Sequence, residues 1–143
     1  MAPSKTPLNR LNHILEEASE IEAATRGLSF ETFRDTWMIR RSVEHGLLII
    51  AEAIKTLPPE LKSVRQDIPW GKIESLGNYL RHEYRDIDPA ILWRIVRRQL
   101  VELVAAVHDI IASMEKVVEV QSVLPISHFL SAPRQLCQSC PAD

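Results

Sequence analysis

The sequence predicts a single all-α domain whose helices form an up-and-down four-helix bundle. Three observations support this prediction: apolar residues recur with a helical period of 3.6, glycine occurs only 4 times in 143 residues, and no stretch alternates with the period of two typical of strands. Apolar residues make up 45% of the chain, which is enough for one core. We expect residues 1–124 to form the helical domain. Residues 125–143 lose the periodicity and are expected to form a flexible tail.

The first two helices are bounded by local signals. The first is expected over residues 7–25 and ends before Gly27, since glycine is common just past a helix end. Ser29 is a candidate N-cap of a second helix, which should run without a break to about Leu57. Its predicted apolar positions are Phe30, Phe33, Trp37, Val43, Leu47, Ile50 and Ile54. Pro58 and Pro59 end this helix, and a loop is expected to follow through Gln66.

The third helix is expected to begin at residues 67–70 and to continue to Tyr84. The fourth has the clearest start, because Asp88 can cap the helix while Pro89 occupies its first position. Its apolar pattern continues to about Val118, so it would be about 45 Å long if unbroken. A helix of that length could kink or protrude.

Composition excludes several classes of protein. The net charge is −2, so any contact with nucleic acid must come from a local patch. No apolar run is long enough for a membrane span, and the N-terminus lacks a secretory signal core. Cys137 and Cys140 lie near the C-terminus, have only His128 nearby, and are expected to form neither a disulfide framework nor a metal site. A cytoplasmic protein without a cofactor is the simplest expectation.

A polar cluster over residues 77–86 carries the candidate chemistry. Asn78 and His82 are four residues apart and would share one face of the third helix, with Arg81 beside them. A purely structural role is the alternative, because basic side chains at a helix C-terminus complement the helix dipole and form surface ion pairs.

The order of these segments resembles the HepT branch of the HEPN superfamily. The landmarks of that branch are an Ile-Ile-Gly-Glu-Ala-like segment, a Pro-Trp helix start, an Arg-Asn-x-x-x-His-x-Tyr motif and an Asp-hydrophobic-Trp start to the next helix. The corresponding segments here are residues 49–53, 69–70, 77–84 and 86–93. No single landmark is specific, but their order and spacing match over roughly residues 8–103.

The resemblance implies roles for individual residues. The family's Asn, His and Tyr align with Asn78, His82 and Tyr84, whereas its Arg falls at Gly77. Arg81, one turn later, is the expected substitute. Relatives of this kind are metal-independent ribonucleases that act as homodimers, with two motifs facing each other across the interface. His82 would then transfer the proton when the ribose 2′-hydroxyl attacks the phosphate, with Arg81 stabilising phosphate charge and Asn78 orienting the phosphate or the imidazole.

Further residues have supporting roles in this hypothesis. Tyr84 would accept AMP from a partner nucleotidyltransferase, or would simply pack on the following turn. Glu52, at the family's glutamate position, could pair with Arg81 or the backbone near the motif, or form an ion pair at the surface or an interface. Arg41 lies near the same stripe of the second helix as Glu52. A basic concentration could attract RNA or simply be a solvated face; it comprises Arg81, Arg85, Arg94, Arg97 and Arg98.

The resemblance implies the toxin component of a HEPN/nucleotidyltransferase toxin–antitoxin pair. Its expected partners are a second copy of itself, a small nucleotidyltransferase antitoxin and RNA, with tRNA as one candidate; neither DNA nor a membrane is expected. The main alternative is a non-catalytic binding module that partners with, or is AMP-modified by, a nucleotidyltransferase. A structural dimerisation domain is a third interpretation. A nucleotidyltransferase gene next to this one would support the first two.

Overall fold

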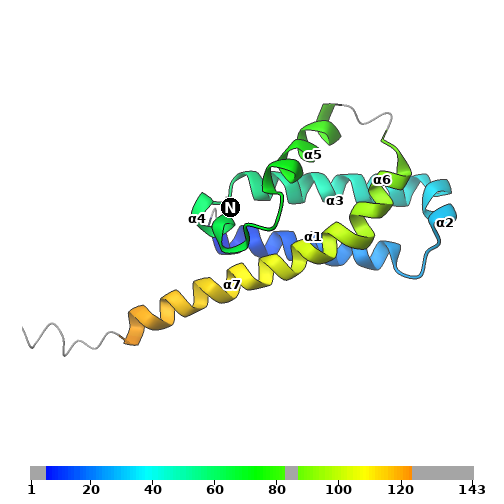
Figure 1. Ribbon diagram of the computed structural model, residues 1–143. Helices are drawn as coiled ribbons and strands as arrows, with labels where there is room; N and C mark the ends of the chain where they lie inside the picture. Colours follow the sequence, from blue (N-terminus) through cyan, green and yellow to red (C-terminus); the bar gives the residue numbers. More distant parts are fainter. Residues whose placement is uncertain (1–5, 83–86, 124–143) are drawn as a thin grey trace, which may run out of the picture. The chain divides into compact units, whose positions relative to one another are not determined.

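The computed structural model describes residues 6–82 and 87–123, and residues 120–123 only as part of a helix. These residues form helices and no strand, which confirms the predicted all-α class. Figure 1 shows the main helices running in alternating directions, from α1 (Pro7–Thr25) through α3 (Trp37–Lys55) and α5 (Trp70–His82) to the start of α7 (Leu100–Val123). The chain divides into two compact units after Ser113, and the described part of the second unit is the end of α7.

Helix α1 has the predicted bounds because both of its ends are encoded locally. The Thr6 side chain accepts a hydrogen bond from the Asn9 amide, and Pro7 follows at the first helical position. At the other end, Gly27 has a φ of 73°. That left-handed conformation favours glycine and turns the chain out of the helix.

The predicted second helix is wrong in one respect, because it is interrupted at Thr36. Helix α2 (Phe30–Asp35) begins at the predicted cap Ser29, whose side chain accepts from the Thr32 amide. Thr36 then adopts an extended conformation (φ −99°, ψ 95°), and its hydroxyl donates to the Thr32 carbonyl at 2.7 Å. This bond offers the backbone an alternative to continuing the helix.

The break changes the position of Trp37. The sequence placed Trp37 on the apolar stripe of one long helix, but in the structure it begins α3 and is 60% exposed. Its neighbour Met38 is 72% exposed. The apolar periodicity alone could not predict the exposure of Trp37 and Met38, because a new helix with its own register begins after Thr36.

The expected loop after α3 also differs from the structure. Residues 59–65 form a short helix, α4 (Pro59–Lys62), followed by the 3₁₀ turn η1 (Ser63–Arg65). The indole Nε1 of Trp70 donates to the carbonyls of Lys62 and Arg65, both at 3.0 Å. The first residue of α5 therefore fixes the segment that precedes it.

The predicted fourth helix begins where it was expected. Asp88 caps α6 (Pro89–Arg94) by accepting a hydrogen bond from the Ala90 amide at 2.9 Å. The π-helical turn η2 (Ile95–Gln99) then joins α6 to α7, a distortion that the sequence did not predict. Helix α7 has 24 residues and is the longest described helix, as expected of the last helix. The predicted tail, 125–143, lies outside the described residues.

The core is built around α3, which packs on both α1 and α5. Gly46 lies at the contact with α1, where an added Cβ would be 2.8 Å from Ile21 Cδ1. The absence of a side chain therefore lets the two helices approach closely. The largest fully buried apolar side chains are Leu11, Ile14, Phe33, Val43, Ile50, Ile54, Leu92, Val107 and Ile110.

Candidate functional site

The last turn of α5 separates a buried face from an exposed face. Gly77 and Leu80 are buried, whereas Asn78, Arg81 and His82 are exposed. The three predicted catalytic side chains therefore lie on one helix end outside the core. They are accessible to a ligand, although their positions are equally compatible with complementing the helix dipole.

Arg81 forms an ion pair with Glu52 of α3, one of the arrangements expected from the sequence. An Arg81 Nη2 group donates to Glu52 Oε1. The two side chains are 40% and 45% exposed, so solvent weakens the attraction between them. Glu52 holds the guanidinium of Arg81, the residue that directly precedes His82, but it also neutralises the charge of that guanidinium. A phosphate would have to share Arg81 with this carboxylate or displace it.

Gly77, the position of the family's missing arginine, lies where α5 passes close to α3. A Cβ built on Gly77 would lie only 2.6 Å from the Ala51 Cβ, but 3.9 Å from the Ala51 Cα. The first distance is a clash, and the second is an ordinary contact. A Gly77→Arg variant would therefore have to displace Ala51 before it could restore the family's arginine.

Position 51 corresponds to the glycine of the family's Ile-Ile-Gly-Glu-Ala segment. In this chain, alanine replaces that glycine and glycine replaces the motif arginine at position 77. The two departures face each other in the structure. Here the small residue that permits the close crossing lies on α5 rather than on α3.

Arg41 lies near the start of α3 and contacts two neighbouring side chains there. Its Nη1 donates to Glu44 at 2.8 Å, and its guanidinium lies 5.8 Å from the centre of the Trp37 ring. Glu52 is eleven residues farther along α3, a separation of about 16 Å along the helix axis. The predicted supporting role of Arg41 stays a prediction.

Several candidate residues fall outside the described part of the chain. These are Tyr84, the predicted AMP acceptor, and Arg85, together with Cys137, Cys140 and His128 of the tail. Their predicted roles stay predictions.

The arginines of α6 and η2 lie in two different environments. Arg97 lies 4.2 Å from the centre of the Trp93 ring, and its Nη2 donates to the carbonyl of Thr25 at 2.9 Å. Arg97 therefore holds the end of α1 against η2. Arg94 and Arg98 are exposed, and neither forms an ion pair with another described residue.

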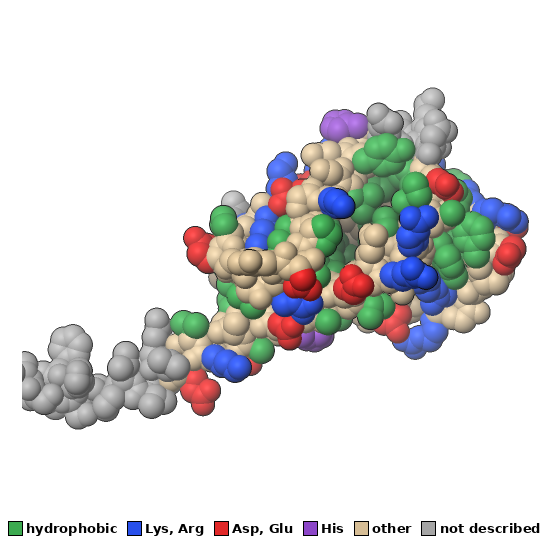
Figure 2. All heavy atoms as spheres, in the orientation of Figure 1, with side chains coloured by type: hydrophobic (Ala, Val, Ile, Leu, Met, Phe, Trp, Pro, Cys, Tyr) green, Lys and Arg blue, Asp and Glu red, His purple; other side chains and the backbone are tan. Residues whose placement is uncertain are grey.

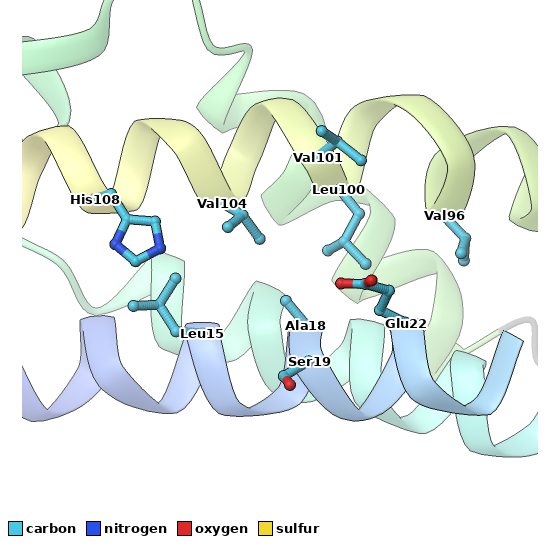
Figure 3. Close-up of a pocket in the computed structure, with 9 residues that line it drawn as sticks. All are labelled: Leu15, Ala18, Ser19, Glu22, Val96, Leu100, Val101, Val104 and His108. Atoms are coloured by element: carbon cyan, nitrogen blue, oxygen red, sulfur yellow. The ribbon is translucent and has the colours of Figure 1, made fainter. Parts of the chain in front are cut away.

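Two surface hollows were not predicted from the sequence. One, of about 270 Å³, lies between α1 and α7 and has His108 and Glu22 among its mainly apolar lining residues (Figure 3). The other lies between α5 and η2 and includes Lys72 and Arg94. Lys72 had no signal in the sequence, because it is a single lysine whose proximity to Arg94 depends on tertiary packing.

No helix among residues 6–82 and 87–123 is long and apolar enough to cross a membrane. Within the same ranges, no group of three or more His, Cys, Asp or Glu side chains could hold a metal ion.

Comparison with known proteins decides the family. A family model described as "Ribonuclease HepT-like" matches residues 14–110, which include most of α1, all of α3 and α5, and the exposed motif residues Asn78 and His82. The chain belongs to this family. It is thus a HEPN-type protein of the ribonuclease HepT-like group, as the motif order had suggested.

Curated relatives agree with this assignment. The chain is 34% identical to "Putative RNase TTE0752" of Caldanaerobacter subterraneus over 75% of its own length and 96% of the relative. It is 32% identical to "Probable ribonuclease HepT" of Thermococcus cleftensis, over 65% of this chain and 84% of that protein. No solved structure gives a significant match.

Proposed function

We propose that this HepT-like chain is a metal-independent ribonuclease with His82 as its proton-transfer group. The observation that carries the proposal is the exposure of His82 and Asn78 at the end of α5, in a chain of the ribonuclease HepT-like family. An imidazole can exchange protons near neutral pH, and an exposed one can reach a bound RNA strand.

The proposed reaction is an internal transfer at phosphorus. The ribose 2′-oxygen forms a bond to the adjacent phosphorus as the bond to the 5′-oxygen of the next nucleotide breaks. His82 accepts the proton of the 2′-hydroxyl or supplies one to the leaving 5′-oxygen, and a second imidazole or water completes the exchange. Arg81 stabilises the charge on the phosphate oxygens, and Asn78 orients the phosphate or the imidazole.

A homodimer would provide that second imidazole. Trp37 and Met38 begin an outer stripe of α3 that continues through Arg41 to Glu52, the partner of Arg81. Trp, Met and Arg are enriched at the centres of protein interfaces. A second copy seated on this stripe would lie beside the motif, so the two motifs could face each other.

The oligomeric state tests this arrangement. Wild-type protein is expected to sediment as a dimer at micromolar concentration, and Trp37→Ser/Met38→Ser as a folded monomer with reduced cleavage. Leu8→Ser, an exposed apolar residue on α1, is the control and should remain dimeric. A monomeric wild type would contradict the composite site.

We further propose that the chain is the cytoplasmic toxin of a toxin–antitoxin pair. Its partner would be a small nucleotidyltransferase that blocks the toxin by transferring AMP to Tyr84. Co-expression with a nucleotidyltransferase encoded beside this gene should relieve growth inhibition and add the mass of AMP to the peptide containing Tyr84. An unmodified peptide from a neutralised toxin would contradict the modification.

A specific observation favours a second candidate, a non-catalytic binding module. Gly77 cannot supply the motif's guanidinium, and Glu52 already engages Arg81. If this candidate is correct, purified wild-type protein cleaves no RNA.

The decisive comparison uses a double variant. Gly77→Arg should fold poorly because of Ala51, whereas Ala51→Gly/Gly77→Arg places the new Cβ 3.9 Å from the nearest remaining Ala51 atom, its Cα. Under the ribonuclease proposal, the double variant should cleave RNA faster than wild type, and Arg81→Lys should cleave more slowly. A well-folded double variant without any activity, alongside an inactive wild type, would favour the binding module.

A further inference from the structure

The hollow between α5 and η2 combines an apolar floor with cations on opposite walls. It has a volume of about 300 Å³, at the lower end of the range for ligand pockets. Ile73 and Leu76 of α5 and Ile91 of α6 contribute to the floor. Figure 2 views this face and shows basic side chains (blue) over α5 and α6 with hydrophobic side chains (green) between them.

The two cations of this groove are available to a ligand. Lys72 lies on α5 and Arg94 on α6, both exposed and neither in an ion pair with a residue that the structure describes. Glu74, the carboxylate nearest to Lys72 along the chain, is engaged by Lys62 Nζ at 2.6 Å. The groove therefore has two positive charges that this carboxylate does not neutralise.

The π-helical turn shapes one wall of the groove. In an α-helix, side chains five residues apart point about 140° away from each other. In η2, the Leu100 amide bonds to the Ile95 carbonyl, so residues five apart lie one turn apart. Arg94 and Gln99 therefore both line the groove, and Gln99 adds a hydrogen-bonding amide to its lining.

The groove lies on the same helix as the candidate catalytic residues. Lys72 precedes His82 by ten residues on α5, which is about 15 Å along the helix axis. A strand bound in the groove and following α5 would reach the motif. Alternating phosphates and bases match a surface that alternates cations with apolar side chains.

We propose that this groove binds single-stranded RNA, with Lys72 and Arg94 on successive phosphates and a base against Ile73, Leu76 and Ile91. The proposal rests on the proposed ribonuclease function, because it takes RNA as the ligand. In this proposal the groove holds the RNA strand beside the cleavage site. Arg94 then binds RNA, whereas Arg97 has the structural role of holding the end of α1.

Fluorescence anisotropy with a short fluorescein-labelled single-stranded RNA tests the groove. All proteins carry His82→Ala so that the probe stays intact. Each phosphate contact contributes about 0.7 to the slope of log affinity against log salt. Lys72→Gln/Arg94→Gln should therefore lower the slope by about 1.4 and weaken binding about 25-fold at 0.1 M salt.

Two further variants separate the groove from a general charge effect. Lys55→Gln/Arg26→Gln removes the same charge from exposed positions outside the groove and should change the slope little. Ile91→Ser should weaken binding without changing the slope, since it removes contact with a base rather than with a phosphate. An unaffected Ile91→Ser variant would overturn the base contact.

The remaining outcomes distinguish this proposal from the ribonuclease proposal. If Lys72→Gln/Arg94→Gln binds like the charge-matched control, or if no protein binds the RNA, the groove proposal is overturned whatever the enzyme does. If the groove variant loses binding but protein with His82 intact cleaves no RNA, the groove stands and the ribonuclease proposal fails.

Discussion

The double variant Ala51→Gly/Gly77→Ala moves one methyl group from α3 to α5 and should preserve the contact between these two helices. Each of the two single variants should weaken that contact. In Gly77→Ala, the new Cβ lies 2.6 Å from the Ala51 Cβ. Overpacking of this kind costs about 1–3 kcal/mol, while alanine gains about 1 kcal/mol in helix propensity. The variant should therefore lose between roughly 0 and 2 kcal/mol of unfolding free energy.

The complementary change should also destabilise the protein. Ala51→Gly loses about 1 kcal/mol in helix propensity and about 0.8 kcal/mol from the buried methyl group. In Ala51→Gly/Gly77→Ala the propensity terms cancel, a methyl group is buried again, and its nearest contact becomes the Cα of residue 51 at 3.9 Å. The double variant should be within about 0.5 kcal/mol of wild type.

Urea unfolding followed by circular dichroism measures the cycle. The two single losses sum to roughly 3 kcal/mol, so the coupling free energy should be on the order of 2–3 kcal/mol. If the double variant instead loses the full sum of the single variants, positions 51 and 77 do not contact each other. The reasoning about the missing arginine would then be refuted.

Three other predictions concern the rest of the chain. A chain ending at Val123 should keep the thermal stability of the full chain, because the described core residues lie between positions 11 and 110; a large fall in Tm would contradict this. Arg97→Lys should lose about 1–2 kcal/mol of unfolding free energy, since an ammonium cannot both stack on Trp93 and reach the Thr25 carbonyl as a guanidinium does, and an unchanged stability would reject that role. Hydrogen bonds from Arg65 lower the pKa of Asp67, so this pair stabilises the fold above the ordinary aspartate pKa near 4 and loses its effect as the pH falls through the lower folded-state pKa. Arg65→Gln should flatten that part of the acid-unfolding profile, and an identical profile would contradict the assignment.

The sequence predicted the elements whose ends are encoded locally. The predicted start of the first helix at residue 7 and the start given by Asp88 with Pro89 are the same in the structure. The interruption at Thr36 was missed because apolar residues continue on either side of it, and periodicity averages over a single extended residue. The π-helical turn was missed because an i→i+5 bond leaves no local signal in composition.

The candidate site was predictable to a similar degree. Helical spacing placed Asn78 and His82 on one face, and the structure adds that this face is exposed. The consequence of Gly77 could not be predicted, because a missing arginine in a sequence does not reveal a neighbouring methyl group. Likewise, the groove at Lys72 joins residues from separate helices, whose proximity depends on packing.

The central claim, that His82 transfers the proton in a metal-independent cleavage, is tested most directly by the ends of the RNA products. Wild-type protein in EDTA should leave 2′,3′-cyclic phosphate and 5′-hydroxyl ends, detectable by mass spectrometry. His82→Ala should reduce the rate by about 10²–10⁴ while keeping the wild-type circular dichroism spectrum. Cleavage that requires an added divalent ion, or that is equally fast in His82→Ala, would contradict the account.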